Sequence, residues 1–248
     1  RALCTRRTLG AGRALQTHGA GGTHIAAAAA ELQTKEYAAI IIEGIQGVAG
    51  IFTPEASYLK QVRQLCNETG TVLIMDEIQS GYGRSGKFFA HQHAGVEADI
   101  VSMAKGIANG FPVGAIIVSP KIEPWHGMLG TTFGGNHLAC AAALAVLKVI
   151  KEENLVENAA VMGKYFMEGL SKYTGEGKPF KELRGEGLMI GIEVNPGFEE
   201  TRNRLLFEKK IFTGGAGKTI MRLLPPLCVG KAEADKFFAA LDELLETK

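Results

Sequence analysis

Two short apolar runs, each ending in polar residues, constrain the fold of this chain more than any other feature. Residues 71–75 are followed directly by Asp76, and residues 99–103 lead to Ala104 and Lys105. Runs of this length that are rich in β-branched and aliphatic residues are typical of buried strands. Ligands of open α/β folds bind at the carboxyl ends of such strands. We therefore expect Asp76 and Lys105 to lie over one crevice.

The chemistry of these two side chains suggests a cofactor. Lys105 stands beside Gly106 at the end of a buried run, where its amine is expected to be desolvated. Desolvation lowers the pKa of a lysine toward that of a usable nucleophile. Such an amine forms a Schiff base with a carbonyl cofactor, and pyridoxal 5′-phosphate (PLP) also needs an acidic partner for its pyridine nitrogen. A PLP site at Asp76 and Lys105 is therefore our hypothesis.

The composition is that of an ordinary soluble globular protein. A chain of 248 residues with 46% hydrophobic and 21% charged residues can hold one large domain or two modest ones. A formal net charge of +1 gives no reason to expect nucleic acid as a partner. The cysteines form no Cys-x-x-Cys pair and indicate reduced thiols. No apolar run reaches the length of a membrane span, so we expect no membrane partner and a cytoplasmic location.

The chain is expected to divide into three parts. Residues 1–36 are basic, contain no acid before Glu31 and show no periodicity, which predicts an irregular or poorly defined start. Their lack of serine argues against a transit peptide. Residues 37–153 predict an incomplete α/β large domain with a mostly parallel sheet, because strands and helices alternate. Residues 154–248 predict a smaller carboxyl-terminal α/β domain.

The expected elements follow from periodicity and capping residues. They are strands at 38–42, 71–75, 99–103, 113–118, 188–194 and 219–224, helices at 54–69, 137–152, 154–173, 202–209 and 233–246, and a glycine-rich loop at 214–217.

Two further patterns suggest ligands only weakly. Gly81, Gly83 and Gly86 have the GxGxxG spacing, but they follow no strand-to-helix turn, so a flexible turn is favoured over a nucleotide site. His91 and His93 are two residues apart, which on a helix directs them away from each other. We therefore expect solvated histidines and no metal pair.

The segment 130–135 precedes Asn136, a good N-cap for the helix that follows. Threonine hydroxyls and backbone N–H groups at a helix N-terminus form a natural phosphate cradle. A turn that only caps the helix explains the same residues. The sequence alone leaves both interpretations open.

Five stretches together resemble the class III aminotransferases of fold type I, which are PLP enzymes, and most closely the acetylornithine and succinylornithine aminotransferases. Each stretch alone is weak evidence, but the combination is specific and extends the resemblance over residues 37–248. The stretches are residues 42–47, 73–87, 104–106, 130–136 and 223–227.

The resemblance implies four cofactor-binding residues. Lys105 would be the catalytic, Schiff-base lysine, and Asp76 would pair with the pyridine nitrogen. Gln79 would face the phenolic oxygen of the ring. Thr132 would bind the phosphate, in this family usually across the interface of a homodimer.

The resemblance also implies two substrate-binding residues. Thr131 would lie beside the substrate, and Arg222 would receive its carboxylate through bidentate hydrogen bonds. Related ornithine enzymes carry a glutamate at the position of Val48, where it can pair with the arginine. Val48 cannot do so, and the dual-substrate switching that this pair allows is therefore not expected here.

The reaction implied is transfer of the amino group of N-acetyl- or N-succinylornithine to 2-oxoglutarate, in arginine biosynthesis. One alternative is another class III PLP enzyme, such as an aminomutase, a decarboxylase or an omega-aminotransferase. Another is a catalytically impaired fragment or a non-catalytic interaction module.

The family carries a further amino-terminal region that holds a second phosphate loop, an aromatic residue stacked on the ring and an arginine for the acyl group. None of these is recognisable in residues 1–36. The chain therefore resembles the carboxyl-terminal part, roughly two-thirds, of such an enzyme. We expect it to bind PLP weakly and to expose apolar surface.

Overall fold

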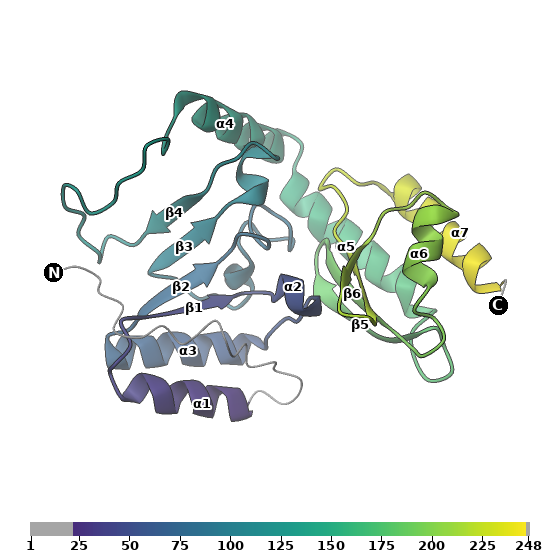
Figure 1. The fold of residues 1–248 in the computed structure, drawn as a ribbon, viewed down its shortest axis with the longest axis horizontal. Coiled ribbons are helices and arrows are strands. Elements are labelled where there is room, and N and C mark those ends of the chain that lie inside the picture. The colour runs from purple at the N-terminus through teal and green to yellow at the C-terminus, as the bar shows by residue number, and fades with distance from the viewer. Residues whose placement is uncertain (1–21, 247–248) are drawn as a thin grey trace. The chain divides into compact units, whose positions relative to one another are not determined.

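The computed structural model describes residues 22–246, which form two compact units (Figure 1). Unit 1 contains the described residues up to Gly44, Pro54–Gly81 and Phe89–Val149. Unit 2 contains Ile45–Thr53, Tyr82–Phe88 and the chain from Ile150 onward. The expected second part, residues 154–248, did not include the two short segments that unit 2 takes from the first half of the chain. That domain division stays a prediction.

The centre of unit 1 is a four-stranded sheet in the order β1-β2-β3-β4. β1, β2 and β3 are parallel, and β4 is antiparallel to β3. The mostly parallel sheet agrees with the α/β class expected from the sequence. The strands are β1 (Ala39–Glu43), β2 (Val72–Asp76), β3 (Ile100–Met103) and β4 (Ala115–Val118).

Two helices, α1 (Gly22–Gln33) and α3 (Ala56–Thr69), lie side by side below this sheet in Figure 1. α3 ends at Gly70, whose φ of 72° and N–H bond to the Cys66 carbonyl make it the expected C-cap. Helix α1 shows that the prediction of an irregular start is wrong for residues 22–33, because the run 26–30 is all alanine, the residue of highest helix propensity. Residues 1–21 lie outside the described part. The core between helices and sheet contains Leu32, Ile40, Leu59, Val62, Cys66, Leu73 and Met75.

The strand predicted as buried at 113–118 is partly exposed. β4 is an edge strand, and Ile116 and Ile117, which point to opposite faces, are each about half exposed. In α4 (His137–Glu152), residues 138–147 are all apolar, yet Leu138 and Leu144 are also exposed. Helices that are apolar all round are normally buried. This part of unit 1 therefore carries apolar surface that the described residues leave uncovered.

Unit 2 is built on an antiparallel sheet in the order β5-β6-β8-β7. Two of its strands were not predicted: Phe180–Glu186 forms β5, and the expected loop at 214–217 contains β7 (Gly214–Ala216). Glycine has low strand propensity, so pattern alone missed β7, whose backbone pairs with β8. The remaining elements are α2 (Gly47–Gly50), α5 (Leu155–Ser171), β6 (Met189–Val194), α6 (Thr201–Phe207), β8 (Ile220–Leu223) and α7 (Lys231–Glu246).

The core of unit 2 joins α5 and α7 to the sheet through residues such as Phe166, Phe180 and Ile190. One contact in it is between backbones. A Cβ added to Gly163 in α5 would lie 2.3 Å from the Gly187 carbonyl oxygen, so only glycine lets the helix approach the β5–β6 turn this closely.

We predict that Gly163→Ala destabilises unit 2 by about 1–3 kcal/mol, because the methyl group meets backbone that no rotamer change can move. This loss has to exceed the gain of about 1 kcal/mol that alanine brings to a helix interior. Urea unfolding measures the difference. Lys164→Ala, at the neighbouring side chain that is 80% exposed, is the control. An alanine variant as stable as the parent would show that the contact is not tight.

Candidate active site

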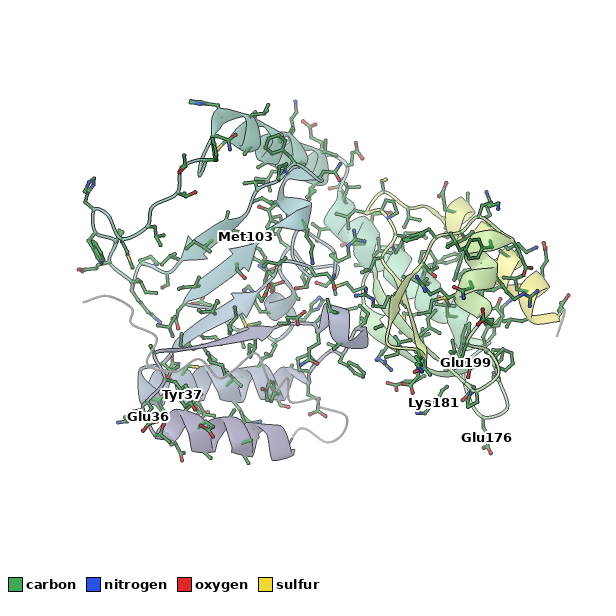
Figure 2. The ribbon with its side chains drawn as sticks, in the orientation of Figure 1. Glu36, Tyr37, Met103, Glu176, Lys181 and Glu199 are labelled. Atoms are coloured by element: carbon green, nitrogen blue, oxygen red, sulfur yellow. The ribbon has the colours of Figure 1, made fainter. Side chains whose placement is uncertain are left out.

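The register of β2 and β3 brings the two key residues to one edge of the sheet. Asp76, the last residue of β2, lies opposite Ser102 of β3. Met103, labelled in Figure 2, ends β3, and Lys105 follows two residues later as the start of a 3-10 helix, η2 (Lys105–Ala108). Asp76 and Lys105 therefore both stand at the carboxyl edge of adjacent parallel strands.

The backbone of Lys105 has an uncommon conformation. Its φ is +46°, in the left-handed region that non-glycine residues rarely adopt. Such conformations cost about 1–3 kcal/mol and cluster at functional sites. The Lys105 side chain is exposed, so the desolvation expected from the sequence is not found. The sequence pattern places Lys105 at the end of a buried run, whereas the residue lies beyond the end of β3, in η2.

Asp76 is held in a local turn. Its Oδ1 atom accepts a hydrogen bond of 3.0 Å from the backbone N–H of Ile78, which orients the carboxylate at the end of β2. The side chain is half-buried. The carboxylate is thus fixed in position while part of its surface stays accessible.

Two buried oxygens beside Asp76 lack hydrogen-bond partners among the described residues. They are Gln79 Oε1 and Ser102 Oγ. An unpaired buried polar atom costs about 1–3 kcal/mol, so native proteins rarely contain one without a functional reason. Gln79 lies in the turn that follows Asp76, and Ser102 lies opposite Asp76 in the pairing of β2 with β3. A ring carrying a phenolic hydroxyl and other polar groups can bond to an amide oxygen that accepts and a hydroxyl that donates or accepts, so these two groups suit PLP.

The sequence analysis missed a buried pair beneath this edge, Glu77 and His91. Glu77 is 1% exposed, and Nδ1 of His91 lies 2.7 Å from its Oε1 atom. The carboxylate also accepts bonds from Ser80 Oγ at 2.6 Å and from the backbone N–H groups of Ala90 and His91 at 3.0 and 2.9 Å. His91 is therefore not the solvated residue that its spacing suggested, because it is buried and bonded to the carboxylate of Glu77, which is distant in the chain.

The electrostatics of Glu77 follow from this arrangement. Burial alone raises the pKa of a carboxyl group, but the hydrogen bonds from His91, Ser80 and the two backbone N–H groups outweigh it and hold the pKa of Glu77 below its ordinary value of 4.5. The hydrogen bonds of the folded protein therefore favour the charged form of Glu77. Glu77 lies between Asp76 and Gln79 in the chain and joins their turn to the 3-10 helix η1 (Ala90–His93).

Thr131 and Thr132 lie in the segment before α4, and both are exposed. Asn136 caps the helix as expected, since its Oδ1 accepts the Ala139 N–H at 2.9 Å. Gly134 makes the turn possible, because a Cβ there would lie 2.0 Å from the Thr131 methyl group. The helix cap is thus supplied by Asn136, and a phosphate-binding role of Thr132 stays a prediction.

Arg222 belongs to unit 2, where it is half-buried in β8. Its Nη1 donates a bond of 3.0 Å to the Gly47 carbonyl, and its buried Nε has no partner among the described residues. A surface arginine would show neither feature. The unpaired Nε–H suits an anionic ligand.

Other candidate sites find no support in residues 22–246. Gly83 and Gly86 pack against Val156 and Ala160 of α5, which gives them a structural reason to be glycine. Within the same residues, no group of three His, Cys, Asp or Glu side chains is placed to hold a metal ion. None of the described helices has both the length and the apolar character needed to cross a membrane.

Comparison with known proteins relates this chain to one enzyme family. A family model described as "Aminotransferase class-III" matches residues 14–245. Acetylornithine aminotransferase of Methanosarcina mazei is 41% identical over 210 residues, which are 85% of this chain and 52% of that protein. Among solved structures, ornithine aminotransferase of Plasmodium yoelii has a TM-score of 0.81 at 30% identity, covering 90% of this chain and 60% of that chain.

An S-selective transaminase from Arthrobacter sp. is similar as well, with a TM-score of 0.80 at 31% identity over 91% of this chain and 55% of that one. The chain spans about half the length of the curated relatives it matches.

We predict that Glu77→Gln loses about 2–4 kcal/mol of unfolding free energy at pH 7, because an amide cannot accept all four bonds. The pKa of Glu77 is lowered on folding, so its contribution is present above the unfolded value and lost as the pH falls through the folded one. The difference from the parent should therefore shrink below about pH 4.5.

Urea unfolding at pH 7 and pH 3.5 measures this difference. Glu68→Gln, at an exposed carboxylate of α3, should change little at either pH. A Glu77→Gln variant with the same deficit at both pH values would contradict the electrostatic explanation.

Proposed function

Because the chain belongs to the class III aminotransferase family, we propose that it serves PLP-dependent transamination from N-acetyl- or N-succinylornithine to 2-oxoglutarate. The observation that carries the proposal is the placement of Asp76 and Lys105 at the carboxyl ends of adjacent parallel strands. The name of the M. mazei relative supports the acylated ornithine, and the place in arginine biosynthesis belongs to the same proposal. A cytoplasmic homodimer is also part of it.

Four residues would hold the cofactor: Lys105, Asp76, Gln79 and Thr132. PLP, when bound, withdraws electrons from the Cα of an attached amino acid. Asp76 would keep a proton on the pyridine nitrogen by placing a negative charge beside it. The Lys105 amine would act as a general base that takes the proton from the substrate Cα, and then as a general acid that delivers it to the cofactor carbon. Its exposure allows the side chain to change position between these two steps.

Arg222 would bind the substrate carboxylate through its unpaired edge, and Thr131 would lie beside the substrate. Arg222 reaches the backbone carbonyl of Gly47, next to Val48. Since Val48 is uncharged and 69% exposed, no carboxylate at this position competes with the substrate. We infer that Arg222 forms one fixed site for the substrate carboxylate. No glutamate at residue 48 pairs with Arg222 to switch it between substrates.

A different class III reaction is the second candidate. The similarity to an S-selective transaminase favours an omega-aminotransferase acting on simple amines. A substrate panel separates the two proposals: activity with N-acetylornithine but not with a simple primary amine supports the first, and the reverse pattern supports the second.

We predict that Lys105→Ala removes the visible absorbance that PLP acquires on bonding to a protein amine. Lys87→Ala and Lys121→Ala, both at exposed lysines of the same chain, should retain it. Borohydride reduction followed by peptide mass spectrometry reports the same bond even at low occupancy. PLP trapped at another lysine in the Lys105 variant would remove the central assignment.

We also predict that Asp76→Asn, which is nearly isosteric, retains PLP but slows removal of the Cα proton by about a hundredfold or more. The reason is that a neutral amide does not keep the pyridine nitrogen protonated. Stopped-flow spectra of the half-reaction with glutamate measure the rate. A variant that reacts at the parent rate would show that Asp76 does not face the nitrogen.

A further inference from the structure

Four residues form one row across the sheet of unit 2. Arg184 of β5 lies opposite Gly191 of β6, Gly191 lies opposite Arg222 of β8, and Arg222 lies opposite Gly214 of β7. Directly opposite residues in antiparallel strands direct their side chains to the same face. Arg184 and Arg222 therefore stand on one face of the sheet, with Gly191 leaving a gap between them.

The short helix α2 occupies this gap. A Cβ added to Gly191 would lie 2.6 Å from the Gly50 carbonyl oxygen and 3.0 Å from the Cβ of Ile51. The backbone of the turn thus rests directly on the glycine. The turn is closed on itself by the Ile51 N–H, which donates to the Gln46 carbonyl at 2.9 Å.

The two arginines hold the two ends of α2. Arg222 Nη1 donates to the Gly47 carbonyl, and Arg184 Nε donates to the Gly50 carbonyl, each at 3.0 Å. The last carbonyl groups of any helix lack the partners that a longer helix supplies, and here guanidinium groups donate to the carbonyls of the first and last residues of α2. Each end of the turn therefore depends on a different arginine.

Arg184 is itself firmly held. Its Nη1 lies 3.0 Å from a carboxylate oxygen of Glu182 and 3.3 Å from one of Glu193, and its guanidinium stacks 4.0 Å from the centre of the Phe52 ring. The side chain is only 10% exposed. Among residues 22–246, Arg222 has no carboxylate partner: it bonds to a backbone carbonyl and keeps an unpaired buried Nε, while the unpaired nitrogen of Arg184 is Nη2.

We propose that Arg184 is a positioning residue for Arg222. By fixing the Gly50 end of the turn, Arg184 fixes the Gly47 carbonyl, which in turn orients the Arg222 guanidinium and leaves its Nε–H edge for a carboxylate. The ligand class is a 2-oxo or 2-amino dicarboxylate such as 2-oxoglutarate. The assignment of that carboxylate to Arg222 rests on the proposed function, whereas the support of the turn rests only on the contacts above.

The test uses the 248-residue chain without added cofactor. Hydrogen exchange is followed in the peptide that contains Gly47–Gly50, and the modification rate of Arg222 by phenylglyoxal is measured by mass spectrometry with and without 2-oxoglutarate. The variants are Arg184→Gln, Arg184→Lys and Gly191→Ala. Arg204→Gln in α6 is a matched control, because Arg204 also joins a carboxylate, Glu208, to a backbone carbonyl, that of Leu244.

We expect Arg184→Gln and Gly191→Ala to speed exchange in the turn and modification of Arg222 by about tenfold or more, the effect of one lost charge-assisted bond. Arg204→Gln should change neither. Arg184→Lys keeps the charge but not the planar fork, so it should also fail to protect the turn. If Arg184→Gln does not fold, Gly191→Ala makes the same test without altering either arginine.

The role in carboxylate binding has its own readout. We expect 2-oxoglutarate to slow modification of Arg222 in the parent and in Arg204→Gln, and to lose this effect in Arg184→Gln. Unchanged exchange in folded Arg184→Gln and Gly191→Ala would overturn the support of the turn. Loosening of the turn without any 2-oxoglutarate protection in the parent would overturn the proposed role of Arg222 alone.

Discussion

The buried carboxylate of Glu77 is the interaction on which the candidate site depends. Its backbone N–H donates to the Ser102 carbonyl at 3.0 Å, which continues the pairing of β2 with β3 beyond Asp76. Its side chain accepts bonds from Ser80, Ala90 and His91. An unpaired carboxylate at this depth would cost several kcal/mol, so the turn after β2 and the segment at η1 have to stay together. The positions of Asp76 and Gln79 follow from that requirement.

The fold was largely predictable because its strongest signals are local. The apolar runs, the Gly70 cap and the Asn136 cap each depend on residues adjacent in the chain, and the comparisons confirm both the α/β class and the aminotransferase resemblance. The failures concern long-range contacts. His91 is buried by a carboxylate 14 positions earlier, and β7 exists because β8 pairs with its backbone. The exposure of Lys105 and its positive φ likewise cannot be predicted from the residue pattern.

The apolar surface of unit 1 connects the fold with the comparisons. α4 and β4 have the composition of buried elements, yet Leu144 is 67% exposed and Ile117 is half exposed. The relatives are about twice as long as the matched part of this chain. An exposed apolar surface of this kind is typical of a protein–protein contact, which fits the homodimer of the proposed function.

Both units place a buried charge that has several ionic or hydrogen-bonding partners next to a residue with an unpaired polar atom. In unit 1, Glu77 has four donors, whereas Gln79, two residues later, keeps an unpaired Oε1. In unit 2, Arg184 contacts two carboxylates and a ring and keeps only its Nη2 unpaired, whereas Arg222 has no carboxylate partner among the described residues and keeps an unpaired Nε. A buried charge that is satisfied internally stabilises the fold at little cost to binding, and the unsatisfied atom is the one with something to gain from a ligand. Under the proposed function, Glu77 and Arg184 affect ligand binding only through the positions of Gln79 and Arg222, so the loss of either one should change stability and ligand binding together.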